Sequence, residues 1–123
     1  MFSILIIDDD VQIRKLLRQM LEQAGYDVVD APDGNIAMQR YRESPADLII
    51  TDLIMPEKKG LETIHELRQQ FADVKIIAIS GGGRVGPARY LEVAEKLGAA
   101  RTIEKPFTRA AILEAVRQLL PQD

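Results

Sequence analysis

Five short apolar runs alternate along the chain with segments in which apolar residues recur at helical spacing. Each run predicts a strand, because consecutive bulky apolar side chains suit a segment that is buried on both sides. The predicted strands are Ile4 to Ile7, Asp27 to Val29, Leu48 to Ile50, Val74 to Ile79 and Ala100 to Ile103. The alternation indicates an α/β fold in which a doubly wound parallel sheet of five strands carries helices on both faces.

The segments between these runs predict amphipathic helices. The apolar residues that mark them are Leu16, Leu17, Met20, Leu21 and Ala24, then Ile64, Leu67 and Phe71, then Leu91, Ala94 and Leu97, and finally Ile112, Val116, Leu119 and Leu120. Asp10 and Thr108 are placed to be N-caps, and Pro87 is placed to open a helix. Gly25 and Gly98 are placed to end helices, where a left-handed residue is common.

The length and composition limit the classes of protein to consider. A chain of 123 residues that is 46% hydrophobic suits one compact domain. The net charge is −3 and no basic block is present, so we expect neither direct nucleic-acid binding nor a membrane partner. The absence of cysteine excludes disulfides and thiolate chemistry. The sequence has no signal peptide and no apolar run of about 18 residues, so we expect a cytoplasmic protein.

Polar residues follow four of the predicted strands. The first strand leads directly into acids in the stretch SILIIDDD, which ends with Asp8, Asp9 and Asp10. Asp52 follows the third strand, and Ser80 follows the fourth. Lys105 follows the fifth. Because the carboxyl ends of parallel strands share one edge of a sheet, we expect these side chains to gather there.

Carboxylates gathered at one edge need a neutralising partner. Two of them about 4 Å apart repel by roughly 4 kcal/mol at an effective dielectric constant of 20. A hard cation such as Mg²⁺ removes this repulsion, and it is typically held by one or two carboxylates together with phosphate oxygens. One carboxylate can then act as a nucleophile toward phosphorus, while a lysine and a hydroxyl group stabilise the phosphoryl oxygens. The residue types therefore indicate phosphoryl-group chemistry.

These residues resemble the receiver domains of two-component response regulators. The resemblance rests on Asp8-Asp9, on Asp52 in TDLIMPEKKG, on Ser80 in IIAISG and on Lys105-Pro106-Phe107, and it spans essentially the whole chain. It implies a flavodoxin-like (βα)5 fold with strand order 2-1-3-4-5. It also implies that residues 1–123 form a single receiver domain with no output domain.

The resemblance implies a role for each matching acid. Asp8, Asp9, Asp52 and the backbone carbonyl of Ile54 would hold Mg²⁺. Asp52 would accept a phosphoryl group from the phosphohistidine of a sensor histidine kinase or from a phosphotransfer protein. The protein would then be a regulator that catalyses its own phosphorylation and dephosphorylation, rather than an enzyme with a separate substrate. It would signal through contacts with a downstream protein that the sequence does not identify.

The resemblance also implies a switch. Lys105 would pair with Asp52 before phosphorylation and with the phosphoryl group afterwards. Its peptide bond to Pro106 would be cis, which would direct the lysine side chain into the site. Ser80 would donate to a phosphoryl oxygen and draw the segment 81–86 toward it. Many family members carry an aromatic ring three residues before the lysine, where this chain has Thr102. We therefore expect switching without burial of a ring at Thr102, and the apolar Ile54 favours slow self-dephosphorylation.

Two other functions are open to this sequence. A phosphatase of the haloacid dehalogenase type would use Asp8 as nucleophile and Asp10 as acid, but Gln12 stands where that motif requires Thr or Val. A pseudo-receiver would act only as a protein-binding module, although it would not need the full set of acids, serine and lysine. Incorporation of phosphate distinguishes all three.

Three further features have simpler explanations. Asp10 directly precedes the helical pattern, so we expect an N-cap rather than a metal ligand. His65 is expected on the polar side of its helix rather than in a phosphorelay. The stretch Gly81 to Gly86 lacks the Lys-Ser/Thr ending of a phosphate-binding P-loop, so we expect a mobile loop.

Overall fold

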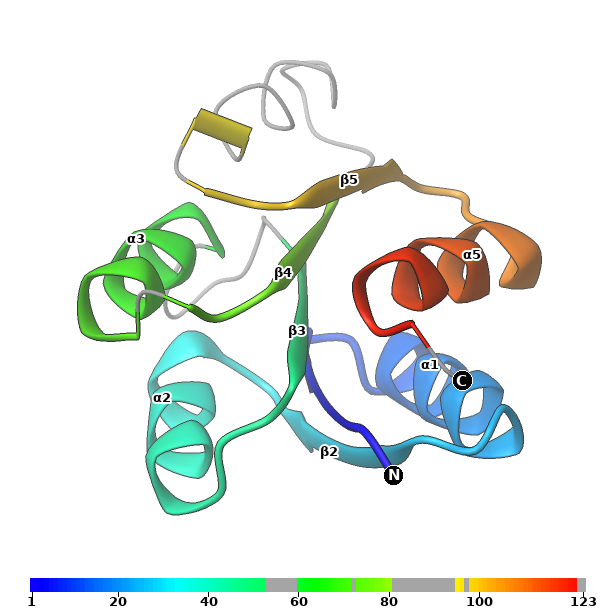
Figure 1. The fold of residues 1–123 in the computed structure, drawn as a ribbon, viewed down its shortest axis with the longest axis horizontal. Coiled ribbons are helices and arrows are strands. Elements are labelled where there is room, and N and C mark those ends of the chain that lie inside the picture. Colours follow the sequence, from blue (N-terminus) through cyan, green and yellow to red (C-terminus); the bar gives the residue numbers. More distant parts are fainter. Residues whose placement is uncertain (53–59, 72, 81–94, 97, 122–123) are drawn as a thin grey trace.

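Five parallel strands form the centre of the molecule. The computed structural model describes residues 1–52, 60–71, 73–80, 95–96 and 98–121. The strands are β1 (Ser3–Ile7), β2 (Asp27–Ala31), β3 (Leu48–Asp52), β4 (Ile76–Ser80) and β5 (Arg101–Glu104). They pair in the order β2-β1-β3-β4-β5 (Figure 1). Both the five-stranded parallel sheet and its expected order are confirmed.

Helices cover both faces of this sheet. They are α1 (Val11–Gln23), α2 (Gly34–Glu43), α3 (Gly60–Gln70) and α5 (Arg109–Leu119). Figure 1 shows α1 and α5 on one face and α2 and α3 on the other. The sequence predicts a further helix from Leu91, Ala94 and Leu97, with Pro87 at its start. These four residues lie outside the described residues. None of the described helices has the length and apolarity needed to cross a membrane.

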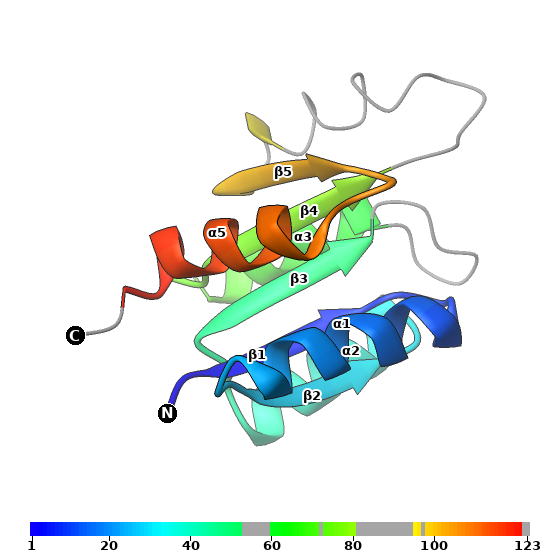
Figure 2. The same ribbon diagram turned by 90° about the vertical axis from the view of Figure 1, so that its right-hand side faces the viewer.

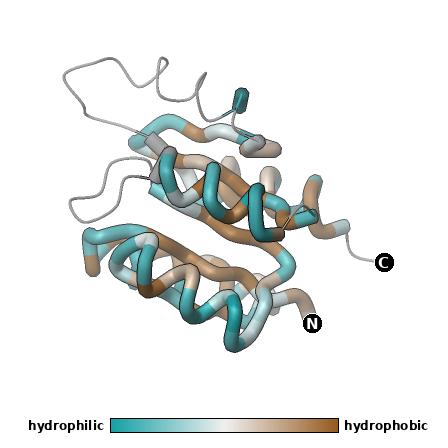
Figure 3. The backbone as a smooth tube through the Cα atoms, turned by 90° about the vertical axis from the view of Figure 1, so that its left-hand side faces the viewer, coloured by the Kyte–Doolittle hydropathy of each residue, from teal (hydrophilic) through white to brown (hydrophobic). Residues whose placement is uncertain are grey.

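The two faces of the sheet bury two separate cores. In β1, Leu5 and Ile7 pack with the α2 and α3 side, whereas Ile4 and Ile6 pack with the α1 and α5 side. A central strand therefore needs apolar residues at consecutive positions, which explains the unbroken run that predicted it. In Figure 3 the hydrophobic segments run through the middle of the molecule and the hydrophilic ones lie mainly along the helices.

Local capping signals are confirmed where the structure describes them. The side chain of Asp10 accepts a hydrogen bond from the backbone N–H of Gln12 at the start of α1. Thr108 accepts one from Ala111 at the start of α5. Gly25 and Gly98 have φ angles of +96° and +116°, which favour glycine because it has no Cβ. His65 is exposed on α3, as expected.

The fourth strand starts later than its apolar run predicts. Val74 is buried, but its backbone N–H donates to the carbonyl of Phe71 in the turn after α3. It therefore belongs to the turn, and β4 begins at Ile76. The run of apolar residues reports burial, which the turn and the strand share.

The carboxyl ends of all five strands meet at one edge. Figure 2 shows the strand arrows pointing the same way, with the N-terminus and the last turn of α5 near the opposite edge. Parallel pairing of Ile7 with Thr51 places the next residues, Asp8 and Asp52, at the same level. The topology thus brings together the polar residues that follow the strands.

Candidate functional site

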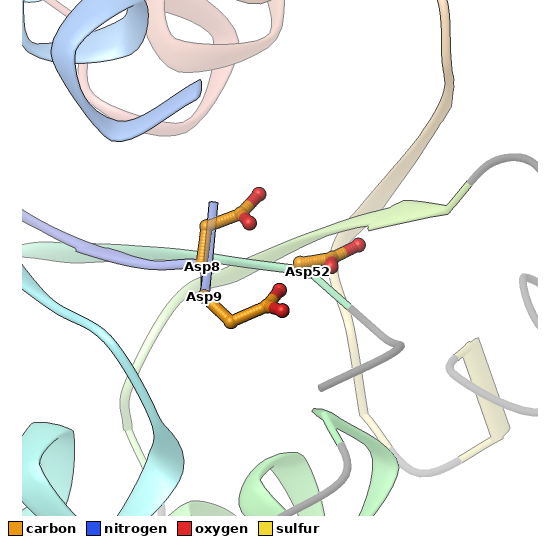
Figure 4. Close-up of side chains that lie close together, drawn as sticks. All are labelled: Asp8, Asp9 and Asp52. Atoms are coloured by element: carbon orange, nitrogen blue, oxygen red, sulfur yellow. The ribbon is translucent and has the colours of Figure 1, made fainter. Parts of the chain in front are cut away.

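Three aspartates gather where β1 and β3 end. Asp8, Asp9 and Asp52 each offer a carboxylate oxygen, and these oxygens all lie within 4.8 Å of one another. Figure 4 shows the three carboxylates projecting to the same side of the strand ends. The structure therefore brings together the acids that the sequence places at the carboxyl edge.

The environments of these acids differ. Asp8 and Asp52 are 2% and 7% exposed, whereas Asp9 is open to solvent. Burial, followed by the charge of Asp8, raises the pKa of Asp52 to about 6. Burial is also the main cause of the raised pKa of Asp8. The paired acids are thus held in a setting that disfavours their charged forms unless a cation is present.

Lys105 supplies one such cation. Its Nζ lies 3.5 Å from Oδ2 of Asp8 and 3.5 Å from Oδ1 of Asp52. It follows β5, and its peptide bond to Pro106 is cis, as the resemblance implied. The ammonium group lowers the pKa of both carboxyls, although burial has the larger effect on each.

The remaining charge suits a divalent cation. In the described part of the site, three ionised carboxylates and one ammonium group leave two negative charges. Carboxylate oxygens are the ligands that hard cations such as Mg²⁺ prefer. An ion with two positive charges would therefore both fit the donor set and offset the repulsion among Asp8, Asp9 and Asp52.

Backbone contacts hold Asp8 in place. Its backbone N–H donates to the carbonyl of Ala31, and its Oδ1 accepts from the backbone N–H of Asp10 at 2.9 Å. Arg14 donates from Nη1 to the carbonyl of Asp8 at 2.6 Å. The sequence patterns do not predict the Arg14 contact, because no strand-end or motif rule places an α1 arginine against the preceding loop.

The other expected site residues are described only in part. Ser80 is the last residue of β4 and is paired with Glu104, which precedes Lys105. Thr102 lies half-buried in β5, and its hydroxyl lies 3.4 Å from Oε1 of Glu95. Ile54 lies outside the described residues, as does the stretch 81–86. The roles of these residues stay predictions.

The sequence and the fold of this chain are similar to those of known proteins. The family model of the response regulator receiver domain matches residues 4–117. The chemotaxis protein CheY of Thermotoga maritima is 34% identical over 117 residues, which cover 94% of this chain and 95% of that protein. The transcriptional regulatory protein CpxR of Escherichia coli is 33% identical over 120 residues, which cover 98% of this chain and 50% of that protein.

A solved structure adds a likeness in three dimensions. The response regulator protein TrrA from Thermotoga maritima, in complex with Mg²⁺–BeF, has a TM-score of 0.85 and 30% identity. The match covers 97% of this chain and 99% of that chain. Together with the acidic cluster at the carboxyl edge, these matches place the chain in a family of signalling phosphoacceptors. The chain belongs to the receiver-domain family of response regulators.

Proposed function

We propose that this protein is a Mg²⁺-dependent switch in which Asp52 accepts a phosphoryl group from the phosphohistidine of a sensor kinase or a phosphotransfer protein. The observation that carries the proposal is the position of Asp52. It is nearly buried, with Asp8 and Asp9 within 4.8 Å and the ammonium group of Lys105 3.5 Å away. The proposed nucleophile, two acids that can hold a metal and a cation that can bind phosphate thus share one site.

Asp8, Asp9 and Asp52 would hold the metal, together with the carbonyl of Ile54. When bound, Mg²⁺ supplies positive charge that offsets the carboxylates and the incoming phosphoryl oxygens. The likeness to TrrA, solved in complex with Mg²⁺–BeF, supports this assignment.

Asp52 must be ionised to attack. A pKa of about 6 leaves most of its carboxyl ionised at neutral pH. One carboxylate oxygen forms the new bond to phosphorus, and the P–N bond of the donor phosphohistidine breaks. The electron pair stays on the imidazole nitrogen, which takes up a proton. Lys105 then moves its ammonium group from the carboxylate to the phosphoryl oxygens, which suits its flexible stem.

The new phosphoryl group would drive the switch. It adds a charge of about −1.5 to −2 and three strong acceptors at Asp52. The hydroxyl of Ser80 donates to one of these oxygens in our proposal. Position 102 carries a threonine, so the proposed switch buries no aromatic ring there. The output is a protein contact with a downstream target.

The two alternatives have less support. The haloacid dehalogenase mechanism needs Asp10 as an acid, but its carboxylate is occupied as the N-cap of α1. Membership of the receiver family also argues against that mechanism. A pseudo-receiver would have no need for Lys105 to face both Asp8 and Asp52.

Phosphate incorporation tests the proposal. We expect acetyl phosphate with Mg²⁺ to add one phosphoryl group, stable in acid and labile in base, as measured by intact mass. Asp52→Asn should abolish the addition, whereas Asp73→Asn, which alters an exposed acid in the turn before β4, should keep it. Labelling that survives in Asp52→Asn and disappears in Asp8→Asn would support the phosphatase. No incorporation into the unaltered protein would support the pseudo-receiver.

A further inference from the structure

Arg14 links the acidic loop, which comprises Asp8, Asp9 and Asp10, to the edge strand β2. It lies in the first turns of α1, and its side chain is 16% exposed. Its Nη1 donates to the backbone carbonyl of Asp8 at 2.6 Å. A short bond from a charged donor to a carbonyl is strong, and here it is largely shielded from water. The bond therefore fixes the peptide that joins Asp8 to Asp9.

A carboxylate on β2 holds Arg14 in turn. Oδ2 of Asp30 lies 3.8 Å from Nε of Arg14 and 3.7 Å from Nη1 of Arg18. Arg18 also donates from Nη2 to the carbonyl of Val28 at 3.0 Å. The two arginines therefore share one carboxylate but donate to different backbone carbonyls. Arg14 donates to the acidic loop, whereas Arg18 donates to β2.

The direction of the Asp9 side chain depends on this peptide. Asp9 is exposed, and no hydrogen bond or ion pair holds its carboxylate within the described part of the chain. Its Cα follows the carbonyl that Arg14 binds, while the N–H of Asp8 is tied to Ala31 on β2. With both peptides of Asp8 anchored, the position from which the Asp9 side chain starts is set by the backbone, and only its own rotamers remain to be chosen.

We propose that Arg14 is a positioning residue of the metal site. It holds the Asp8–Asp9 peptide so that the Asp9 carboxylate faces Asp52, and Asp30 orients its guanidinium. The inference rests on the proposed function, because it concerns the same Mg²⁺ site. Because Arg14 binds the backbone carbonyl of Asp8, it acts in this proposal through the geometry of that bond.

Binding of Mg²⁺ to the unphosphorylated protein tests this role. The chain has no tryptophan, so titration calorimetry is the direct method. Arg14→Met removes every donor but keeps an apolar stem, and Arg18→Met is the matched control. We expect Arg14→Met to weaken Mg²⁺ binding about tenfold, as loss of a partner that orients a metal ligand does. Arg18→Met should stay within about twofold of the unaltered protein, because its carbonyl contact is to Val28.

A kinetic measurement separates positioning from general damage. In the phosphorylation of Asp52 by acetyl phosphate, Arg14→Met should shift the Mg²⁺ dependence of the rate to higher concentration by the same factor. The rate at saturating Mg²⁺ should be unchanged, because excess metal restores the occupied site. A lowered plateau with unchanged Mg²⁺ affinity would overturn the inference, as would an equal loss of affinity in Arg18→Met.

Asp30→Asn gives a milder second variant that keeps the shape of the side chain. We expect it to weaken Mg²⁺ binding about threefold, and the double variant with Arg14→Met to be no weaker than Arg14→Met alone, since both changes release one contact. Additive losses would contradict this. Failure of the unaltered protein to bind Mg²⁺ or to take up phosphate would instead refute the proposed function and this inference with it.

Discussion

The ammonium nitrogen of Lys105 lies 3.5 Å from a carboxylate oxygen of Asp8, a residue 97 positions earlier in the chain. The same nitrogen lies 3.5 Å from Asp52. One cation thus faces two acids whose pKa values are raised, chiefly by burial. Its contribution to stability must therefore depend on whether those acids are ionised.

We predict that Lys105→Met destabilises the metal-free protein more at pH 8 than at pH 4. At pH 8, well above the pKa of about 6, Asp52 is ionised and loses its partner, which costs about 1 kcal/mol. At pH 4 Asp52 is largely protonated, so little attraction is lost. Urea unfolding at the two pH values measures the difference, with Lys75→Met as a control far from the acids. An equal loss of stability at both pH values would show that the ammonium group does not interact with ionised acids.

Asp52→Asn should change the pH dependence of stability without metal. In the folded protein the pKa of Asp52 is about 6, above the ordinary value of 3.8. Between these values the folded state binds the proton more tightly, so the free energy of unfolding falls as pH rises. The variant lacks this fall and should be more stable at pH 7 by on the order of 1 kcal/mol. Parallel pH profiles for the two proteins would contradict the raised pKa.

Mg²⁺ should stabilise the folded protein, because it binds only where the acids are gathered. A concentration one hundred times the dissociation constant adds about 2.7 kcal/mol. Asp9→Asn should remove most of this effect and, without metal, raise stability by about 0.5 kcal/mol through reduced repulsion. Thermal melts with and without Mg²⁺ measure both signs. An unchanged Mg²⁺ effect in Asp9→Asn would exclude Asp9 as a ligand.

Ser80→Ala and Thr102→Ala should affect the rate of phosphorylation differently, because only the hydroxyl of Ser80 is proposed to bind the phosphoryl group. Loss of the proposed Ser80 donor should slow phosphorylation by acetyl phosphate at least tenfold. Thr102→Ala should stay within about twofold, because its hydroxyl faces Glu95 rather than the acids. Rates are followed by intact mass at fixed Mg²⁺. Slowing in Thr102→Ala equal to that in Ser80→Ala would assign the hydroxyl of Thr102 to the site.

The sequence by itself determined the features that depend on local pattern. Consecutive apolar residues predicted strands buried on both faces, and the acids after Ile7 and at Asp52 predicted the composition of the carboxyl edge. Capping by Asp10 and Thr108 was also predictable, because a cap is a contact between residues two or three positions apart.

Only the tertiary structure decided the contacts that cross between elements. One example is the unequal burial of Asp8 and Asp9, which are adjacent residues of the same type. The reach of Arg14 to the Asp8 carbonyl depends on the angle at which α1 packs beside β2 and on the position of Asp30. Periodicity reports which face of an element is buried. It carries no information on which side chain of one element meets which backbone atom of another, because that depends on register, helix packing and rotamer together.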